Sequence, residues 1–167
     1  MGFQIGDMVV YGIHGVCKIA DTEVRIVDRK TVEYFVLVPI NQKNAKFYLP
    51  MHNPSAVSKI RNILTREQLT ALLQSEQIKE DDWILNEAAR KEKYRDLITQ
   101  ADCGALIRTL RALEVHKQQQ RAEGKKLHIC DENFMKDAER VIRLEVAAVM
   151  DIPLEQVGDF IRGIIVE

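Results

Sequence analysis

The hydrophobic period of the sequence changes once, near residue 55, and this change constrains the fold more than any other feature. Residues 5–50 contain short apolar runs that alternate with polar residues and are separated by turn residues, a pattern typical of β-strands. From Thr65 onward, apolar residues recur at intervals of three and four, as in amphipathic helices. The sequence therefore predicts an α+β protein, in which a β module is followed by helices.

The β module is expected to hold four or five short strands, because tight turns interrupt its apolar runs. The strands are predicted at residues 8–11, 16–20, 23–27, 31–38 and 46–50. Strands of this length and spacing favour a small SH3-like or Tudor-like barrel. Such a module has little surface for a catalytic pocket of its own and typically binds a partner along an edge strand or a groove.

The helical part is predicted to be an all-α bundle of about five helices around one core. Thr65 to Gln68 fit a capping box, which predicts a helix start, and Asp102 is expected to cap a later helix. Pro153 is expected near the start of the last helix. We therefore predict a β module over residues 1–55, a linker over 56–64 and a helical domain over 65–167.

Motifs for catalysis and cofactor binding are absent from the sequence. No phosphate-binding glycine loop and no nucleophile elbow occurs. His14 lies in a turn without an evident nucleophile or acid partner, so we expect its ring to pack on the rim of the β module. The three cysteines and four histidines are scattered, which argues against a metal site. We therefore expect no enzyme, no cofactor and no metal.

The same sequence features predict a cytoplasmic protein. No apolar run approaches the roughly 18–20 residues needed to span a bilayer, and the first residues lack the basic and apolar regions of a signal peptide. The odd number of cysteines without a paired spacing indicates a reducing compartment. We expect no membrane association; the oligomeric state is left open, with a monomer as the working assumption.

Charge is distributed unevenly between the two parts. Residues 1–64 hold 8 Lys and Arg against 5 Asp and Glu, a net +3, whereas the remainder holds 16 against 20, a net −4. The whole chain carries a formal charge of −1. A protein of this kind does not bind nucleic acid through bulk charge, so any DNA contact must use a local basic patch.

Trp83 is the only tryptophan, and its environment in the sequence allows two interpretations. It follows the acidic run Glu80-Asp81-Asp82, which is typical of a helix N-terminus, and we expect that helix to extend to about Gln100. The ring could extend the buried stripe of this helix. Alternatively, because Glu87 and Arg90 interrupt the stripe, the N-terminal turns could be exposed, with the indole as a minor-groove wedge beside basic residues.

Several motifs together resemble one known family, the CarD/CdnL transcription regulators. They are a glycine–aspartate opening at Gly6, a His-Gly turn at His14, a strand beginning at Glu33, a strand ending at Pro50, and a later tryptophan after acidic residues. The resemblance extends into the helical half, over Leu97-Ile98 and over the helix that contains Ala138 and Ala148. The first module alone is also similar to the polymerase-binding module of transcription-repair coupling factors.

The resemblance implies a Tudor-like module that binds the β subunit of bacterial RNA polymerase. Arg25 matches a polymerase-contacting arginine of the family, and Tyr48 occupies the position where some relatives carry a second one. With Val27 on the same strand as Arg25, these residues form the expected polymerase-binding site.

The resemblance also implies that the helical domain contacts promoter DNA at the upstream edge of the melted bubble, where the tryptophan hinders bubble closure. Asn86 stands where relatives commonly carry an arginine, and the segment after Trp83 is about four residues longer than usual. The expected DNA-binding residues are therefore Trp83, Asn86, Arg90, Lys91 and Lys93.

Two hypotheses for function follow from the sequence. In the first, the protein is a regulator of transcription initiation that binds the polymerase β subunit and contacts the promoter fork to stabilise the open complex. In the second, it is an adaptor that binds polymerase or another protein without contacting DNA, as Asn86 and the net negative charge of the helical part would favour.

Overall fold

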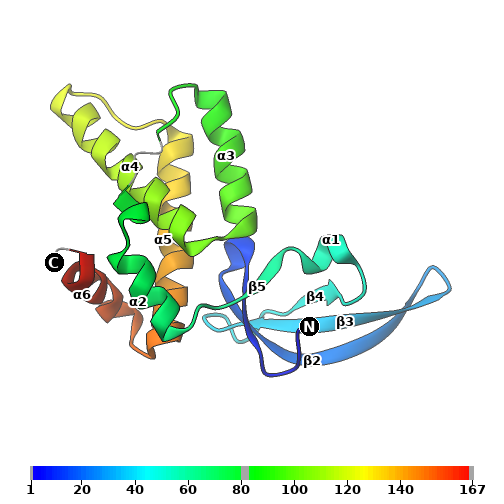
Figure 1. Ribbon diagram of the computed structural model, residues 1–167. Coiled ribbons are helices and arrows are strands. Elements are labelled where there is room, and N and C mark those ends of the chain that lie inside the picture. The colour runs from blue at the N-terminus through cyan, green and yellow to red at the C-terminus, as the bar shows by residue number, and fades with distance from the viewer. Residues whose placement is uncertain (1, 80–82, 166–167) are drawn as a thin grey trace.

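The computed structural model of the protein describes residues 2–79 and 83–165. Five antiparallel strands form one sheet, and the larger helices follow it in the chain and pack beside it (Figure 1). The predicted α+β class, with strands first and about five longer helices after them, is confirmed.

The sheet is built around a long hairpin. Its strand order is β4-β3-β2-β1-β5, and the strands are β1 (Met8–Tyr11), β2 (Val16–Val27), β3 (Lys30–Pro39), β4 (Phe47–Pro50) and β5 (Ile60–Asn62). The two strands expected at 16–20 and 23–27 are one continuous strand, β2. An irregularity in its pairing with β3, between Ile19 and Asp21, lies where the sequence pattern is interrupted.

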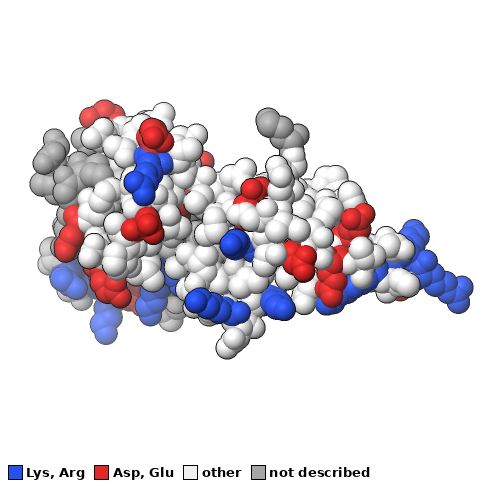
Figure 2. Space-filling model, turned by 90° about the horizontal axis from the view of Figure 1, so that it is seen from below, with Lys and Arg blue, Asp and Glu red and all other residues white. Residues whose placement is uncertain are grey.

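The hairpin of β2 and β3 extends away from the helices, and its tip is the part of the sheet farthest from them (Figure 1). Asp28 and Arg29 form the turn, both with positive φ, at 52° and 67°. Seen from below, basic side chains gather at this tip (Figure 2), and the tip residues Arg29 and Lys30 are exposed. The hairpin therefore presents a charged end to solvent.

The segment predicted as a linker, residues 56–64, belongs partly to the sheet. A short helix, α1 (Pro54–Val57), precedes β5, and β5 pairs with β1 through Val9 and Asn62, Val10 and Arg61, and Tyr11 and Ile60. A strand of three residues is too short to show a hydrophobic period, so no pattern along the chain indicates it. This segment joins the sheet to the helices without a free linker.

Five longer helices form the second part, and their ends largely follow the sequence signals. They are α2 (Arg66–Gln74), α3 (Glu87–Gln100), α4 (Cys103–Ala122), α5 (Ile129–Met150) and α6 (Leu154–Ile165), with a 3₁₀ turn, η2 (Glu76–Lys79), after α2. The capping box at Thr65 and Gln68 and the cap at Asp102 are confirmed. Helix α5 is central, since it contacts each of the other four longer helices.

The two parts share one apolar core, to which the His-Gly turn contributes. Val10 and Val16, from β1 and β2, belong to the same buried cluster as the helical side chains. Between these strands, the short 3₁₀ turn η1 (Gly12–His14) contacts both α3 and α5. Gly15 has a φ of 72°, which other residues rarely adopt, and a Cβ there would lie 2.6 Å from Leu144 Cδ1 and displace that side chain.

An ion pair at the junction joins the sheet to the helices. Arg61 of β5 donates to both carboxylate oxygens of Glu145 on α5, at 2.8 and 2.6 Å, and also to the carbonyl oxygen of Ala101, between α3 and α4. Glu145, 1% exposed, accepts in addition from the backbone N–H of Leu64 at 3.0 Å. Four segments are thus joined through two side chains, and the buried carboxylate is satisfied by several donors.

Replacing Glu145 with alanine is expected to lower the free energy of unfolding by about 3 kcal/mol, because the arginine would lose its partner in a largely dry site. The measurement is urea unfolding followed by circular dichroism. Glu139→Ala, at an exposed position of the same helix, is the control and should change stability by no more than about 0.5 kcal/mol. Equal effects of the two substitutions would contradict the importance of the ion pair.

Candidate partner-binding surfaces

Two surfaces hold the residues that the sequence singled out, one on the hairpin and one among the helices. On the hairpin, alternation along β2 puts Arg25 and Val27 on one face and Val24 and Ile26 on the other. All four side chains are exposed, and Ile26, at 78%, is the most exposed of the three apolar ones. Exposed apolar side chains clustered at one end of a small domain are typical of an interaction site.

Arg25 and Tyr48 lie together on the outer face of the sheet. The guanidinium carbon of Arg25 is 4.1 Å from the centroid of the Tyr48 ring, and its Nη2 lies 3.0 Å from the Glu23 carboxylate. Tyr34 of β3 meets the Tyr48 ring edge-on at 6.5 Å between centroids. The contact with Tyr48 holds an exposed arginine in one orientation, with the exposed Val27 on the same strand face.

The outer half of β2 also has an unpaired edge. Residues 21–27 pair with β3 on one side, whereas β1 pairs only with residues 16–18 on the other side. Ile19 makes the last backbone contacts on that side, with Gly6 and Asp7. Within the described part of the chain, no strand covers the remaining edge, so its backbone groups can pair with a strand of another protein.

Trp83 lies before α3 rather than within it. The helix begins at Glu87, and Asn86 is its N-cap, whose side chain accepts from the backbone N–H of Ala89 at 2.9 Å. The acidic residues 80–82, expected at the helix start, lie outside the described residues. The expectation that Trp83 starts the helix is wrong, because the asparagine side chain supplies the capping group three residues after the tryptophan.

The indole of Trp83 is partly buried and packs on polar side chains. The His116 ring, from α4, stacks on it with centroids 3.7 Å apart and an angle of 23° between the planes. The Arg90 guanidinium carbon lies 4.4 Å from the indole centroid. Burial lowers the pKa of His116 from its ordinary value of 6.5, so the imidazole that stacks at pH 7 is neutral.

A buried ion pair positions Arg90 under the indole. Arg90, 3% exposed, donates from Nε and Nη2 to the two carboxylate oxygens of Asp131 on α5, each at 3.1 Å. Its Nη1 donates to the carbonyl oxygens of Ile84 and Leu85, which fixes the segment after Trp83. Asp131 is fully buried and also accepts from the Tyr94 hydroxyl at 2.6 Å. Burial and this hydrogen bond raise the pKa of Tyr94, so the hydroxyl remains a donor.

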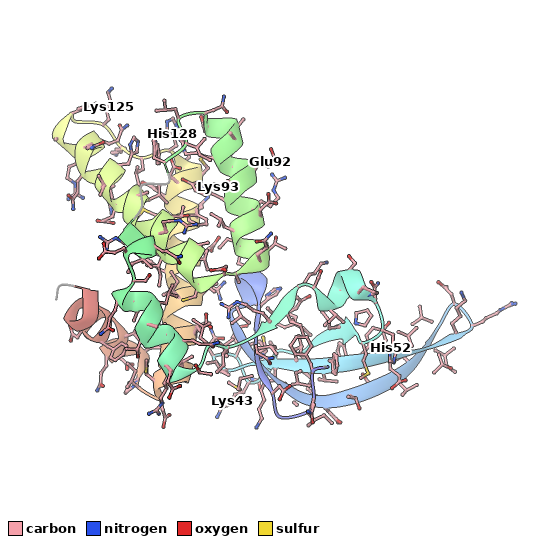
Figure 3. All side chains as sticks on the ribbon, in the orientation of Figure 1. Lys43, His52, Glu92, Lys93, Lys125 and His128 are labelled. Carbon is pink, nitrogen blue, oxygen red and sulfur yellow. The ribbon has the colours of Figure 1, made fainter. Side chains whose placement is uncertain are left out.

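The residues expected to bind DNA differ in how accessible they are. The burial of Arg90 does not fit the expected contact with DNA, since a guanidinium must reach solvent to touch a phosphate; its role here is to hold Trp83. Lys91 is exposed, with its Nζ 3.5 Å from the Glu87 carboxylate. Lys93 lies on the side of α3 toward the other helices, and Glu92 lies on the opposite side (Figure 3). Lys93 and Trp83 both line a cavity of about 10 Å³.

His116 and Asp131 are the residues of this cluster that sequence analysis missed. The available signal was the pair Arg90 and Tyr94, one turn apart on α3, which interrupts an apolar stripe with polar groups. A polar pair in a buried stripe requires a partner. That partner is 41 residues away in the chain, and nothing in the sequence identifies it.

The described residues, 2–79 and 83–165, contain no group of three or more His, Cys, Asp or Glu side chains placed to hold a metal ion. Within the same ranges, no helix is both long enough and apolar enough to cross a membrane.

The fold and these surfaces define a protein-interaction module joined to a helical domain. Residues 3–61 match the family model described as the CarD-like/TRCF RID domain, and this N-terminal part of the chain is thereby a CarD-like domain. The matched range covers all five strands, β5 included up to Arg61. The resemblance inferred from the sequence is confirmed, and it supports a transcription-associated role in which the protein binds RNA polymerase. No curated protein matches the chain.

Replacing His116 with alanine is expected to expose more of the indole of Trp83, because one ring contact, worth about 0.5–1.5 kcal/mol, is lost. Acrylamide quenching of the single tryptophan measures this directly, and the quenching constant should rise. Gln119→Ala, at an exposed position of the same helix, should leave it unchanged. Unaltered quenching in His116→Ala would mean that the stack does not hold the ring.

Proposed function

We propose that this protein regulates transcription initiation by binding the β subunit of RNA polymerase and contacting the upstream edge of the promoter bubble, which stabilises the open complex. The observation that carries the proposal is the pairing of two presented sites in one chain. One is β2 of the matched domain, with an uncovered strand edge at residues 21–27 and with Arg25 and Val27 on its face, where Arg25 contacts Tyr48 of β4. The other is Trp83, held in place among the helices.

The strand edge supports a defined mode of polymerase binding. A strand of the partner would add to residues 21–27 of β2 and form main-chain hydrogen bonds, while the exposed side chains of β2 select the partner. Arg25 would meet an acidic or aromatic group, since its guanidinium is already oriented by Tyr48. The apolar Val27 beside it would be removed from water on binding.

Arg25→Glu is expected to weaken binding to core RNA polymerase by about tenfold or more. The glutamate would face an acidic group of the partner with the same charge, or would leave an unpaired charge against an aromatic group. The side chain is about half exposed, so the fold should be retained. Lys59→Glu makes the same charge change at an exposed position outside the proposed site and should bind as the wild type. Biolayer interferometry compares the three proteins; full binding by Arg25→Glu would exclude this surface.

The position of Trp83 supports the DNA contact. Insertion of a side chain at an unstacked base step requires a ring whose orientation is fixed beforehand. The stack on His116 and the contact with Arg90 supply that orientation. Stacking of an aromatic ring on a base is worth about 1–3 kcal/mol, and about 1.4 kcal/mol corresponds to a tenfold change in an equilibrium or a lifetime.

Trp83→Ala is therefore expected to shorten the open-complex lifetime on a defined promoter by about 5-fold to 100-fold. The control is Leu85→Ala, whose side chain is two residues away and 89% exposed. The lifetime is measured after challenge with a competitor such as heparin. Equal lifetimes with wild type, Trp83→Ala and Leu85→Ala would exclude the wedge.

An adaptor without DNA contact remains the second candidate, because the exposed surface of α3 is not basic. With Arg90 buried, the helix carries three exposed or partly exposed cations, which are balanced by its three acidic residues, Glu87, Glu92 and Asp96. Under this alternative, Arg25→Glu would abolish every effect of the protein on transcription, and Trp83→Ala would abolish none.

A further inference from the structure

The free edge of β2 has a sequence that can pair with a second copy of itself. Residues 21–27 pair with β3 on one side, and within residues 2–79 and 83–165 no strand lies along the other side. Val24 and Ile26 on this part of the strand are 60% and 78% exposed. The hairpin extends away from the helices (Figure 1), so another hairpin can approach it. An exposed edge of this kind is a template for a further strand.

The turn at the tip of the hairpin determines which backbone groups of β2 face the free side. Asp28 and Arg29 have φ values of 52° and 67°, as in the type I′ turn that joins two strands through two residues. Val27 pairs with Lys30 across this turn. In such a turn the carbonyl of the first residue faces the N–H of the fourth. The backbone of Val27 therefore faces β3.

Alternation along the strand then assigns the remaining residues. Every second residue back from Val27 faces β3 in the same way, and the residues between them face outward. Ile26, Val24 and Thr22 therefore direct their N–H and C=O groups to the free side. The backbone N–H of Thr22 donates to the Asp21 carboxylate at 2.8 Å, as expected for a group that faces away from β3. Three outward residues can form a ladder with one more strand.

We propose that this edge pairs with the same edge of a second copy of the chain, antiparallel and centred on Val24. In this register Val24 lies opposite Val24 of the second copy, and Thr22 lies opposite Ile26 of the second copy. All of these residues face outward, as hydrogen-bonded pairs across a ladder require. A twofold axis at Val24 relates the two copies, so the pair of Thr22 and Ile26 occurs twice.

The charged side chains of the edge favour this register. Glu23 lies opposite Arg25 of the second copy, and Arg25 lies opposite Glu23 of the second copy. Within one chain the two side chains already lie 3.0 Å apart, so the dimer brings together four charges of alternating sign. The next registers that pair outward residues would place Glu23 opposite Glu23, or Arg25 opposite Arg25. Opposite charges directly across a ladder stabilise the pairing, and like charges destabilise it.

Self-pairing covers the strand edge and the arginine that the proposed function assigns to polymerase. The competition rests on the proposed function, whereas the dimer itself does not. A contact through one strand of each chain is smaller than most stable interfaces, so the dimer exchanges with the monomer. The dimer is then a reserve form that accumulates when free protein is abundant, and only the monomer presents the edge of β2 to polymerase.

The test follows the dimer of the full-length protein by sedimentation equilibrium, without polymerase. Glu23→Arg and Arg25→Glu are each expected to weaken the dimer by about tenfold or more, because two attractive pairs become repulsive. An equimolar mixture of the two variants should dimerise again, since the paired positions then carry opposite charges. Glu139→Arg makes the first of these charge changes at an exposed position of α5 and should dimerise as the wild type.

Three outcomes would overturn the dimer. They are a wild type that stays monomeric up to millimolar concentration, single variants that dimerise as well as the wild type, and a mixture that does not regain the dimer. Both substituted side chains are about half exposed, so the fold should be retained. Val24→Pro is a second, uncharged variant. It removes an outward N–H, a position where an edge strand tolerates proline, and should also abolish the dimer.

The competition is measured by adding core RNA polymerase to the wild-type dimer. We expect complexes that contain one copy of the chain per polymerase, because each copy must leave its dimer to bind. Two copies per polymerase would overturn the shared edge. Absence of any polymerase binding would contradict the proposed function and the competition, while the sedimentation result would still decide whether the dimer forms.

Discussion

The ion pair of Arg61 and Glu145 is the polar contact that joins the sheet to the helices beside their shared apolar core. Arg61 comes from the last and shortest strand, and Glu145 comes from the central helix. The arginine also holds the turn between α3 and α4 by its carbonyl, and the carboxylate holds the chain entering α2. A buried pair of this kind contributes little net energy compared with apolar packing, but it permits few arrangements of the groups around it. The placement of the hairpin surface relative to the surface around Trp83 depends on this ion pair.

The elements that could be predicted from the sequence are those with a local cause. The strand positions followed from alternation and turn residues, and the starts of α2 and α4 followed from their capping side chains. The strand β5 could not be predicted in this way, since three residues show no period and the pairing is made with a strand about 50 residues earlier. The continuous β2 was divided in two because a pairing irregularity near Asp21 interrupts the alternation.

The helical site was predicted less well, and the reason is burial of charge. Arg90 was expected to be exposed because it interrupts an apolar stripe. A charged residue in such a stripe normally marks an exposed part of a helix, unless a buried partner compensates the charge. Here Asp131 and two backbone carbonyls do so. Arg90 is therefore buried at a position where an unpaired guanidinium would be exposed, and nothing in the sequence marks His116 as the ring that stacks on Trp83. In contrast, Arg25 and Tyr48, which the resemblance assigns to one polymerase-binding site, lie in direct contact.

The shared core has a mechanical consequence. The outer part of the hairpin, residues 21–27, projects roughly 20 Å at the usual rise per residue of a strand. Its inner end is anchored by Val10 and Val16 among helical side chains, and η1 contacts α3 and α5. A hairpin anchored at its base in this way cannot turn as a whole without moving the helical side chains packed on Val10 and Val16, so force from a partner bound to β2 would be passed to the helices. The separation between a partner bound to the outer hairpin and a partner bound to the helices is then set by the anchored base of the hairpin.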